Sequence, residues 1–186
     1  MKLALGVCAL VVMSAVLGAA PARAQEKAAR AKPPLSTSQA LLGQWNDVGR
    51  KLIAMAEDFP KDKYDFKPTP AQQSFGQRVL HAGGVNYFFT DVALGRKAPS
   101  MASANPDQFK TKADIVAFVK KSFADGADAI KKSDMNKVVT DPFSNDRVRL
   151  SDYAYGFVEH SGEIYGQLVV YYRVAGMVPP ESRPKK

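Results

Sequence analysis

The feature that restricts the fold most is an apolar stripe near the C-terminal end of the chain, bounded by clear helix signals. Ser151 is a good N-cap residue preceded by the apolar Leu150, and Gly176 followed by Pro179-Pro180 is a good stop. Alternating steps of four and three residues connect Phe157, Ser161, Ile164, Leu168, Tyr171 and Ala175. This spacing is typical of the inward face of a bundle helix. His160 borders that face, and position 164 points the same way one turn later.

Three earlier segments predict helices of similar length. The first runs from about Ser36 to Asp58, with a periodic face of Leu41, Trp45, Val48, Leu52, Met55 and Phe59. The second begins with a capping box at Ser74 and Gln77 and ends at Gly95, with a face of His81, Val85, Phe88 and Val92. The third runs from Thr111 to about Lys132, with a face of Ile115, Phe118, Ser122, Ala129 and Ile130, and is interrupted at Gly126.

The connections between these segments are long and irregular. Residues 61–73 read as a loop with buried aromatic anchors, among them Phe66, and residues 96–110 and 134–149 read as further loops. We find no β-hairpin and no credible strand. Gly83-Gly84 in the second helix favours close helix packing over room for a ligand. The sequence therefore predicts an all-α protein, a four-helix bundle over residues 36–180 with long crossover loops.

The N-terminal segment has the features of a secretory signal peptide. Lys2 precedes an almost wholly apolar run from Leu3 to Leu17, and Ala22-Arg23-Ala24 is a cleavage site before Gln25. A membrane anchor is the alternative, but the run is shorter than the roughly 20 residues that span a bilayer. We expect residues 1–24 to be removed and the protein to be exported, periplasmic or secreted, without stable membrane insertion. Residues 25–35 read as a disordered leader.

Charge and cysteine content narrow the function classes. The chain has a formal net charge of +8, but residues 33–180 hold 18 basic and 16 acidic residues. The excess is shared equally by the N-terminal segment before Gln25, the leader and a basic tail, residues 181–186, which disfavours nucleic acid as a partner. Without Cys8 in the signal peptide, the mature chain has no cysteine, so disulfides and a cysteine nucleophile are excluded. Homodimer formation is left open.

The two histidines, His81 and His160, are the candidate metal ligands. Each lies on or beside an apolar helix face, where a lone histidine is more often a hydrogen-bonded core residue. Side chains that face each other in bundle cores do form metal sites, so the presence of one histidine on each of two helices favours a metal site more than a single histidine would. Two ligands are too few for a tight zinc site, which usually has three. We see no other catalytic motif, and Tyr165, Tyr171 and Tyr172 are core residues by default.

Several short motifs, taken together in this order, resemble the DinB-like superfamily of four-helix proteins, which includes bacterial thiol S-transferases. The motifs are Tyr64-Asp65-Phe66-Lys67-Pro68, Ser74-Phe75-Gly76-Gln77 before His81, Asn86, Tyr165-Gly166-Gln167-Leu168, Tyr171, Arg173, Gly176 and Pro179-Pro180. The resemblance covers about Trp45 to Pro180. It implies an up-down-down-up bundle that binds a divalent metal through one histidine on the second helix and an H-x-x-x-H pair on the fourth.

Carried over to this chain, the resemblance implies that His81 is the first ligand and His160 the second. The third position holds Ile164, which cannot bind a metal. Glu163 is the candidate replacement: it lies about 100° around the helix from position 164 but only one turn from His160. A carboxylate there could complete a distorted site, whereas the ordinary interpretation is a glutamate that faces solvent.

Two functions follow as hypotheses. The first is a binding module for a small molecule or a metal, whose ligand the sequence does not identify. In this hypothesis the metal site is degenerate, and zinc or nickel is weakly held or absent. The second is a divalent-metal-dependent enzyme, by resemblance a thiol S-transferase, that uses His81, His160 and a substitute ligand. Ile164 favours the first, and so does export, because the small thiols used by such transferases are chiefly cytosolic.

Overall fold

A computed structural model of the protein describes residues 32–97 and 108–184. The compact unit within these ranges begins at Leu35. The predicted signal peptide and residues 25–31 of the predicted leader lie outside the described residues, so both stay predictions. No helix within the described ranges combines the length and the apolar character needed to cross a membrane.

The four predicted helices are confirmed, with ends within a few residues of those expected. They are α2 (Thr37–Asp58), α3 (Phe75–Ala93), α4 (Lys112–Lys132) and α5 (Leu150–Val174). The first three begin with capping boxes, in which the N-cap side chain accepts from the N3 amide and the N3 side chain accepts from the N-cap amide. These caps involve residues only three apart, so the sequence alone could locate them.

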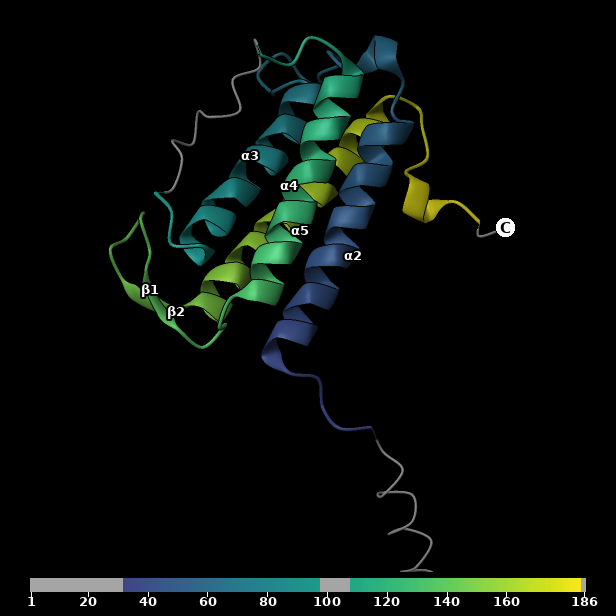
Figure 1. Ribbon diagram of the computed structural model, residues 1–186. Coiled ribbons are helices and arrows are strands. Elements are labelled where there is room, and N and C mark those ends of the chain that lie inside the picture. Colours follow the sequence, from purple (N-terminus) through teal and green to yellow (C-terminus); the bar gives the residue numbers. More distant parts are fainter. Residues whose placement is uncertain (1–31, 98–107, 185–186) are drawn as a thin grey trace, which may run out of the picture. The chain divides into compact units, whose positions relative to one another are not determined.

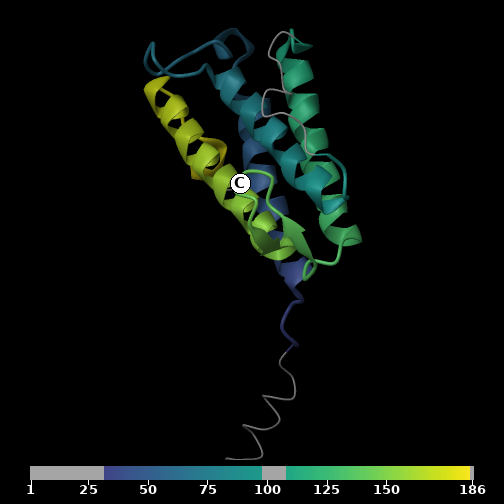
Figure 2. The same cartoon turned by 90° about the vertical axis from the view of Figure 1, so that its left-hand side faces the viewer.

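The helices form a bundle in which α2 and α5 run one way and α3 and α4 run the other (Figure 1). Each of α2 and α3 packs against both α4 and α5, so α2 and α3 lie diagonally opposite each other (Figures 1 and 2). This is the up-down-down-up order that the resemblance implied. The all-α four-helix bundle predicted from periodicity is therefore confirmed.

The interface of α2 and α4 is centred on Trp45. This side chain is 0% exposed, as predicted, and its Nε1 donates a hydrogen bond of 2.9 Å to the carbonyl of Phe123. Its indole lies against Gly126, where a Cβ would overlap it. The predicted interruption of α4 at Gly126 is wrong: the helix is continuous, and the glycine is there because the tryptophan fills the space of a side chain.

The buried face of α3 is wider than the predicted stripe. Phe88 is buried, whereas His81, Val85 and Val92 are only half-buried. The remaining buried positions include Val79, Leu80, Ala82, Gly83, Asn86, Phe89, Thr90 and Ala93. The reason is that α3 contacts two helices, so its buried surface covers more than one face. A Cβ at Gly83 would lie 2.7 Å from Cε1 of Phe118, which confirms close packing at that glycine.

A short antiparallel hairpin precedes α5 and corrects the prediction of no strand. Its strands are β1 (Val138–Thr140) and β2 (Arg147–Arg149), with Val139 opposite Val148. Strands of three residues are too short to show an alternating pattern in the sequence. The half-buried Val139 and Val148 pack against the core, so the bundle stabilises the hairpin.

The hairpin segment also replaces the predicted cap of α5. The N-cap residue is Arg149, which makes no side-chain capping bond, and Ser151 lies inside the first turn. Instead, the amides of Leu150 and Ser151 donate to the carbonyls of Lys137 and Met135, each at 2.9 Å. The free amide groups at the helix start are thus satisfied by tertiary contacts.

The loop after α2 and the C-terminal segment both contact the bundle. Tyr64 is buried and donates to the carbonyl of Ala56, but Phe66 is only half-buried, contrary to prediction. Two residues of the predicted tail pair with α2: Glu181 with Arg50, and Arg183 with Asp58. The described part of the tail, residues 181–184, is therefore held against α2 by ion pairs.

Candidate histidine site

Antiparallel packing of α3 and α5 brings the two predicted site histidines together. The Nε2 atoms of His81 and His160 lie 3.2 Å apart, and their rings meet edge to face with centroids 5.3 Å apart. Both residues are half-buried, and the side chain of His160 is 37% exposed. The pair is therefore in contact across the helix interface while one edge stays accessible to solvent.

The contacts of His160 suggest how protons are distributed in the pair. Oε2 of Glu163 lies 3.4 Å from Nδ1 of His160. A neighbouring carboxylate favours a proton on that nitrogen, which leaves Nε2 of a neutral imidazole as an acceptor. His81 then donates its Nε2–H across the interface. In this arrangement one hydrogen bond joins the two rings.

The pKa of His81 is lowered from its usual value. Burial is the main cause, and the nearby positive charges of His160, when protonated, and Arg78 add to it. Nε of Arg78 is buried and has no hydrogen-bond partner in the structure. Because α3 and α5 are antiparallel, Arg78, one turn before His81, lies level with Ile164, one turn after His160. A cationic residue thus stands on α3 at the level of the missing third histidine.

The two histidine nitrogens are placed to act as two ligands of one metal, but no third ligand among the described residues stands beside them. Two nitrogens bound at about 2.0–2.1 Å to a tetrahedral zinc lie about 3.4 Å apart, close to the observed separation. Ile164, however, is 1% exposed and offers only hydrocarbon. Within residues 32–97 and 108–184 there is no group of three His, Cys, Asp or Glu side chains that could hold a metal. The residues do not fit a complete three-ligand site.

Glu163 lies beside His160 on the side of the ring away from His81. Its contact is with Nδ1, whereas the shared contact of the two rings uses Nε2. Carboxylates in this position commonly orient a histidine and set its tautomer. The geometry therefore suits an orienting role, and a role of Glu163 as third ligand stays a prediction.

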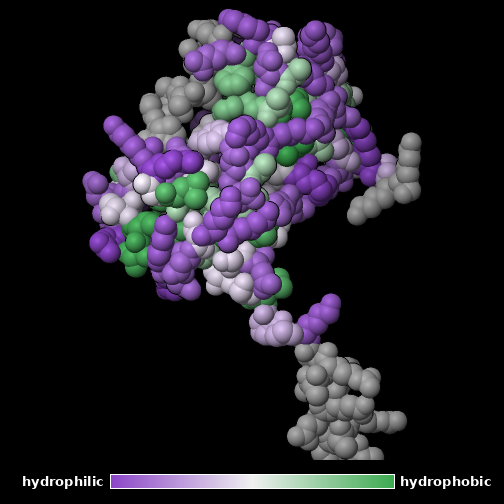
Figure 3. Space-filling model, in the orientation of Figure 1, coloured by the Kyte–Doolittle hydropathy of each residue, from purple (hydrophilic) through white to green (hydrophobic). Residues whose placement is uncertain are grey.

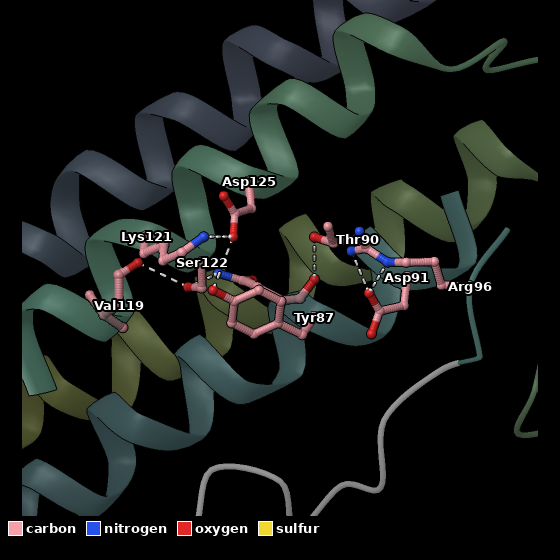
Figure 4. Close-up of polar contacts among 9 residues, drawn as sticks. Tyr87, Thr90, Asp91, Arg96, Val119, Lys121, Ser122 and Asp125 are labelled. Carbon is pink, nitrogen blue, oxygen red and sulfur yellow. Dashed lines mark hydrogen bonds and ion pairs between the residues drawn. The ribbon is translucent and has the colours of Figure 1, made fainter. Parts of the chain in front are cut away.

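A second polar cluster joins α3 to α4 deeper in the bundle (Figure 4). Asn86 is 0% exposed and its side-chain amide donates to Oγ of Ser122 at 3.0 Å, while its backbone carbonyl accepts from the hydroxyl of Thr90. Nearby, Tyr87 donates to Oδ2 of Asp125 at 3.1 Å, and burial together with that carboxylate raises the pKa of Tyr87 to about 12. These bonds tie two parallel helices together, which is a structural role.

In the sequence Asn86 stands out only as part of a motif, and nothing there predicts this cluster. The available signal was Ser122, a polar residue on an otherwise apolar predicted face. A buried hydroxyl needs a partner, but the sequence does not say which helix supplies it.

A four-helix bundle in this order, with histidines facing each other from its second and fourth helices, is the arrangement that the resemblance to DinB-like proteins implied. Comparison with protein-family models agrees: the model described as the DinB superfamily matches residues 44–168, and the chain belongs to that superfamily.

Among solved structures the chain is similar to YfiT from Bacillus subtilis, described as a probable metal-dependent hydrolase with an unusual four-helix bundle topology. The TM-score is 0.61 at 12% identity, over 80% of this chain and 94% of that chain. At this identity the similarity establishes the fold alone. No curated protein matches the sequence.

Proposed function

We propose that this protein is a DinB-like binding module in which His81 and His160 form a two-histidine contact instead of a tight metal centre. The observation that carries the proposal is Ile164, which occupies the third ligand position as a buried hydrocarbon. A second observation supports it. Arg78 lies on α3 at the level of Ile164, and its guanidinium is always positively charged. This charge disfavours a divalent cation nearby.

The test is the metal content of the purified protein. We expect the wild type to retain little zinc or nickel. Ile164→His should raise the affinity for zinc at least tenfold, which corresponds to about 1.4 kcal/mol, because positions 160 and 164 are one turn apart on a shared face. Ile164→Asn, which is polar but a poor zinc ligand, controls for the burial of a polar side chain.

A folding measurement must accompany the metal titration, because position 164 is buried. If Ile164→His remains folded without a gain in affinity, the geometric basis of the proposal fails. Stoichiometric metal in the wild type, lost in His81→Ala, would also contradict it.

The second candidate is a divalent-metal-dependent enzyme. It is favoured by the 3.2 Å separation of the two Nε2 atoms, which is close to that of two ligands on one metal. It is also in keeping with the description of YfiT as a probable metal-dependent hydrolase. In this candidate His81 and His160 would hold the metal, and Glu163 would orient His160. The metal would supply polarisation of a bound substrate.

The variant Glu163→Gln separates the two roles of that carboxylate. If Glu163 is a third ligand, stoichiometric metal in the wild type should be abolished by the substitution. If it only orients His160, binding should weaken about 10–100-fold, as for other outer partners of metal-bound histidines. An enzyme would then be sought among hydrolysis and thiol-transfer reactions with the loaded protein.

A further inference from the structure

A cleft with a volume of about 290 Å³ lies between the hairpin loop and the first half of α5. Its apolar walls are Phe143, Val148 and Phe157. Phe143 is exposed, yet its ring packs on Phe88 with centroids 5.2 Å apart, so it is held in place. Figure 3 shows hydrophobic side chains among hydrophilic ones at the lower left of the molecule, where Figure 1 places the hairpin.

The charged residues that line this cleft are both acidic, although the chain as a whole is basic. They are Asp141 and Asp152, and no lysine, arginine or histidine lines the cleft. The carboxylate of Asp141 accepts from the amide of Phe143 at 2.8 Å and from the hydroxyl of Ser144 at 3.2 Å, so it is fixed in position. Asp152 is exposed and lies 3.7 Å from Nε of Arg149, a weak surface pair.

Tyr153, which also lines the cleft, has a polar group without a partner. The residue is 8% exposed, and its hydroxyl is buried with no hydrogen-bond partner in the structure. Burial, and then the charge of Asp141, raise the pKa of Tyr153, so the phenol stays protonated. Because this hydroxyl is itself buried, the carboxylates of Asp141 and Asp152 are the polar groups through which the cleft can bind a ligand.

We propose that this cleft binds a small organic amine, in which a protonated amino group is attached to an aromatic or aliphatic body. The body lies against Phe143 and Phe157, and the ammonium group donates to Asp141. The cleft does not include His81 or His160, so the proposal is independent of the metal content of the protein.

Three related probes test the charge and the body separately: 2-phenylethylamine, the neutral 2-phenylethanol and the anionic 3-phenylpropionate. Isothermal titration at neutral pH should give saturable binding of the amine, with the other two at least tenfold weaker. Absence of amine binding, or equal affinity for the alcohol, would overturn the proposal.

The glycine that lines the cleft provides the test of location. A Cβ at Gly156 has nothing within 4 Å, so Gly156→Leu can fill the cleft without disturbing the core. The substitution should also favour the helix, because leucine is the better helix former. We expect amine binding to fall at least tenfold with the thermal midpoint unchanged or raised.

Gly166→Leu is the matched control, since Gly166 lies on the same helix in equally open space and outside the cleft. It should leave binding unchanged. Asp141→Asn should weaken binding of the amine at least fivefold. Full retention of binding in Gly156→Leu, or equal losses in the two leucine variants, would show that the probe binds elsewhere and would refute the site.

Discussion

At the residue scale, the contact of Trp45 with Gly126 fixes how closely α2 and α4 approach. The indole lies where a side chain at position 126 would be, and its Nε1 bonds the same helix at Phe123. The rings of Phe89 and Phe123 pack on the indole with centroids 5.1 and 5.5 Å away. One large residue and one glycine thus act as a matched pair.

Substitution of either partner should lower the free energy of unfolding. We expect Trp45→Ala to cost about 3–5 kcal/mol, as for other buried aromatics. Gly126→Ala should cost about 1–3 kcal/mol by overpacking, although alanine is the better helix former. Gly166→Ala, in open space on α5, should stabilise the protein by up to about 1 kcal/mol. Urea unfolding measures all three. A loss below about 1 kcal/mol for Trp45→Ala would contradict the burial of Trp45 between α2 and α4.

At the element scale, helix starts in this protein are stabilised in two different ways. Helix α3 uses a local capping box, with Gln77 N bonded to Oγ of Ser74 and Ser74 N bonded to Oε1 of Gln77. Helix α5 relies on carbonyls of the segment before it, at Met135 and Lys137. The first device can be located in the sequence, whereas the second requires the hairpin to be folded.

The difference predicts unequal effects of two serine substitutions. Ser74→Ala should cost about 0.5–2 kcal/mol, since it leaves the amide of Gln77 without its partner. Ser151→Ala should cost less than about 0.5 kcal/mol, because the Ser151 side chain caps nothing and bonds only the exposed Asp152. Chemical denaturation of both variants measures this, and equal losses would restore Ser151 as a functional cap.

At the scale of the whole molecule, the C-terminal segment ties the end of α5 to α2. Arg183 donates to both carboxylate oxygens of Asp58, at 2.7 and 2.6 Å, and Tyr172 on α5 donates to the same carboxylate at 3.1 Å. The Arg183 guanidinium is the main reason why the pKa of Asp58 lies below its usual value. Asp58 therefore links three parts of the fold.

This lowered pKa gives stability a dependence on acidic pH. The unfolded chain takes up a proton at Asp58 near pH 4, before the folded protein does, so the stabilisation is present above about pH 4 and is lost as pH falls through the folded pKa. We expect Arg183→Met to reduce the loss of stability between pH 5 and pH 3, and Arg183→Lys to restore part of it. Urea unfolding across this range is the measurement, and identical pH profiles would exclude the pair as the cause.

The N-terminal segment supports a further prediction about the mature molecule. The short apolar run and the small residues at Ala22 and Ala24 predict export and a mature chain that begins at Gln25. Intact-mass spectrometry of the protein recovered outside the cytoplasm should show this N-terminus. Recovery of an intact Met1 in a membrane-embedded product would contradict it.

The sequence by itself determined the four helices and the bundle class. Their signals are local: apolar residues three and four apart, and caps such as Ser74 with Gln77 that join residues of one turn. The sequence also identified His81 and His160 as candidate metal ligands and Ile164 as the departure from the family pattern. None of these inferences depends on which helices are neighbours in the bundle.

Only the tertiary structure decided which surfaces meet. It joined His81 to His160 and paired Asn86 with Ser122. It also widened the buried face of α3 and formed the hairpin that starts α5. The physical reason is that helix periodicity specifies an apolar face but not its neighbour, which depends on packing between residues far apart in the chain.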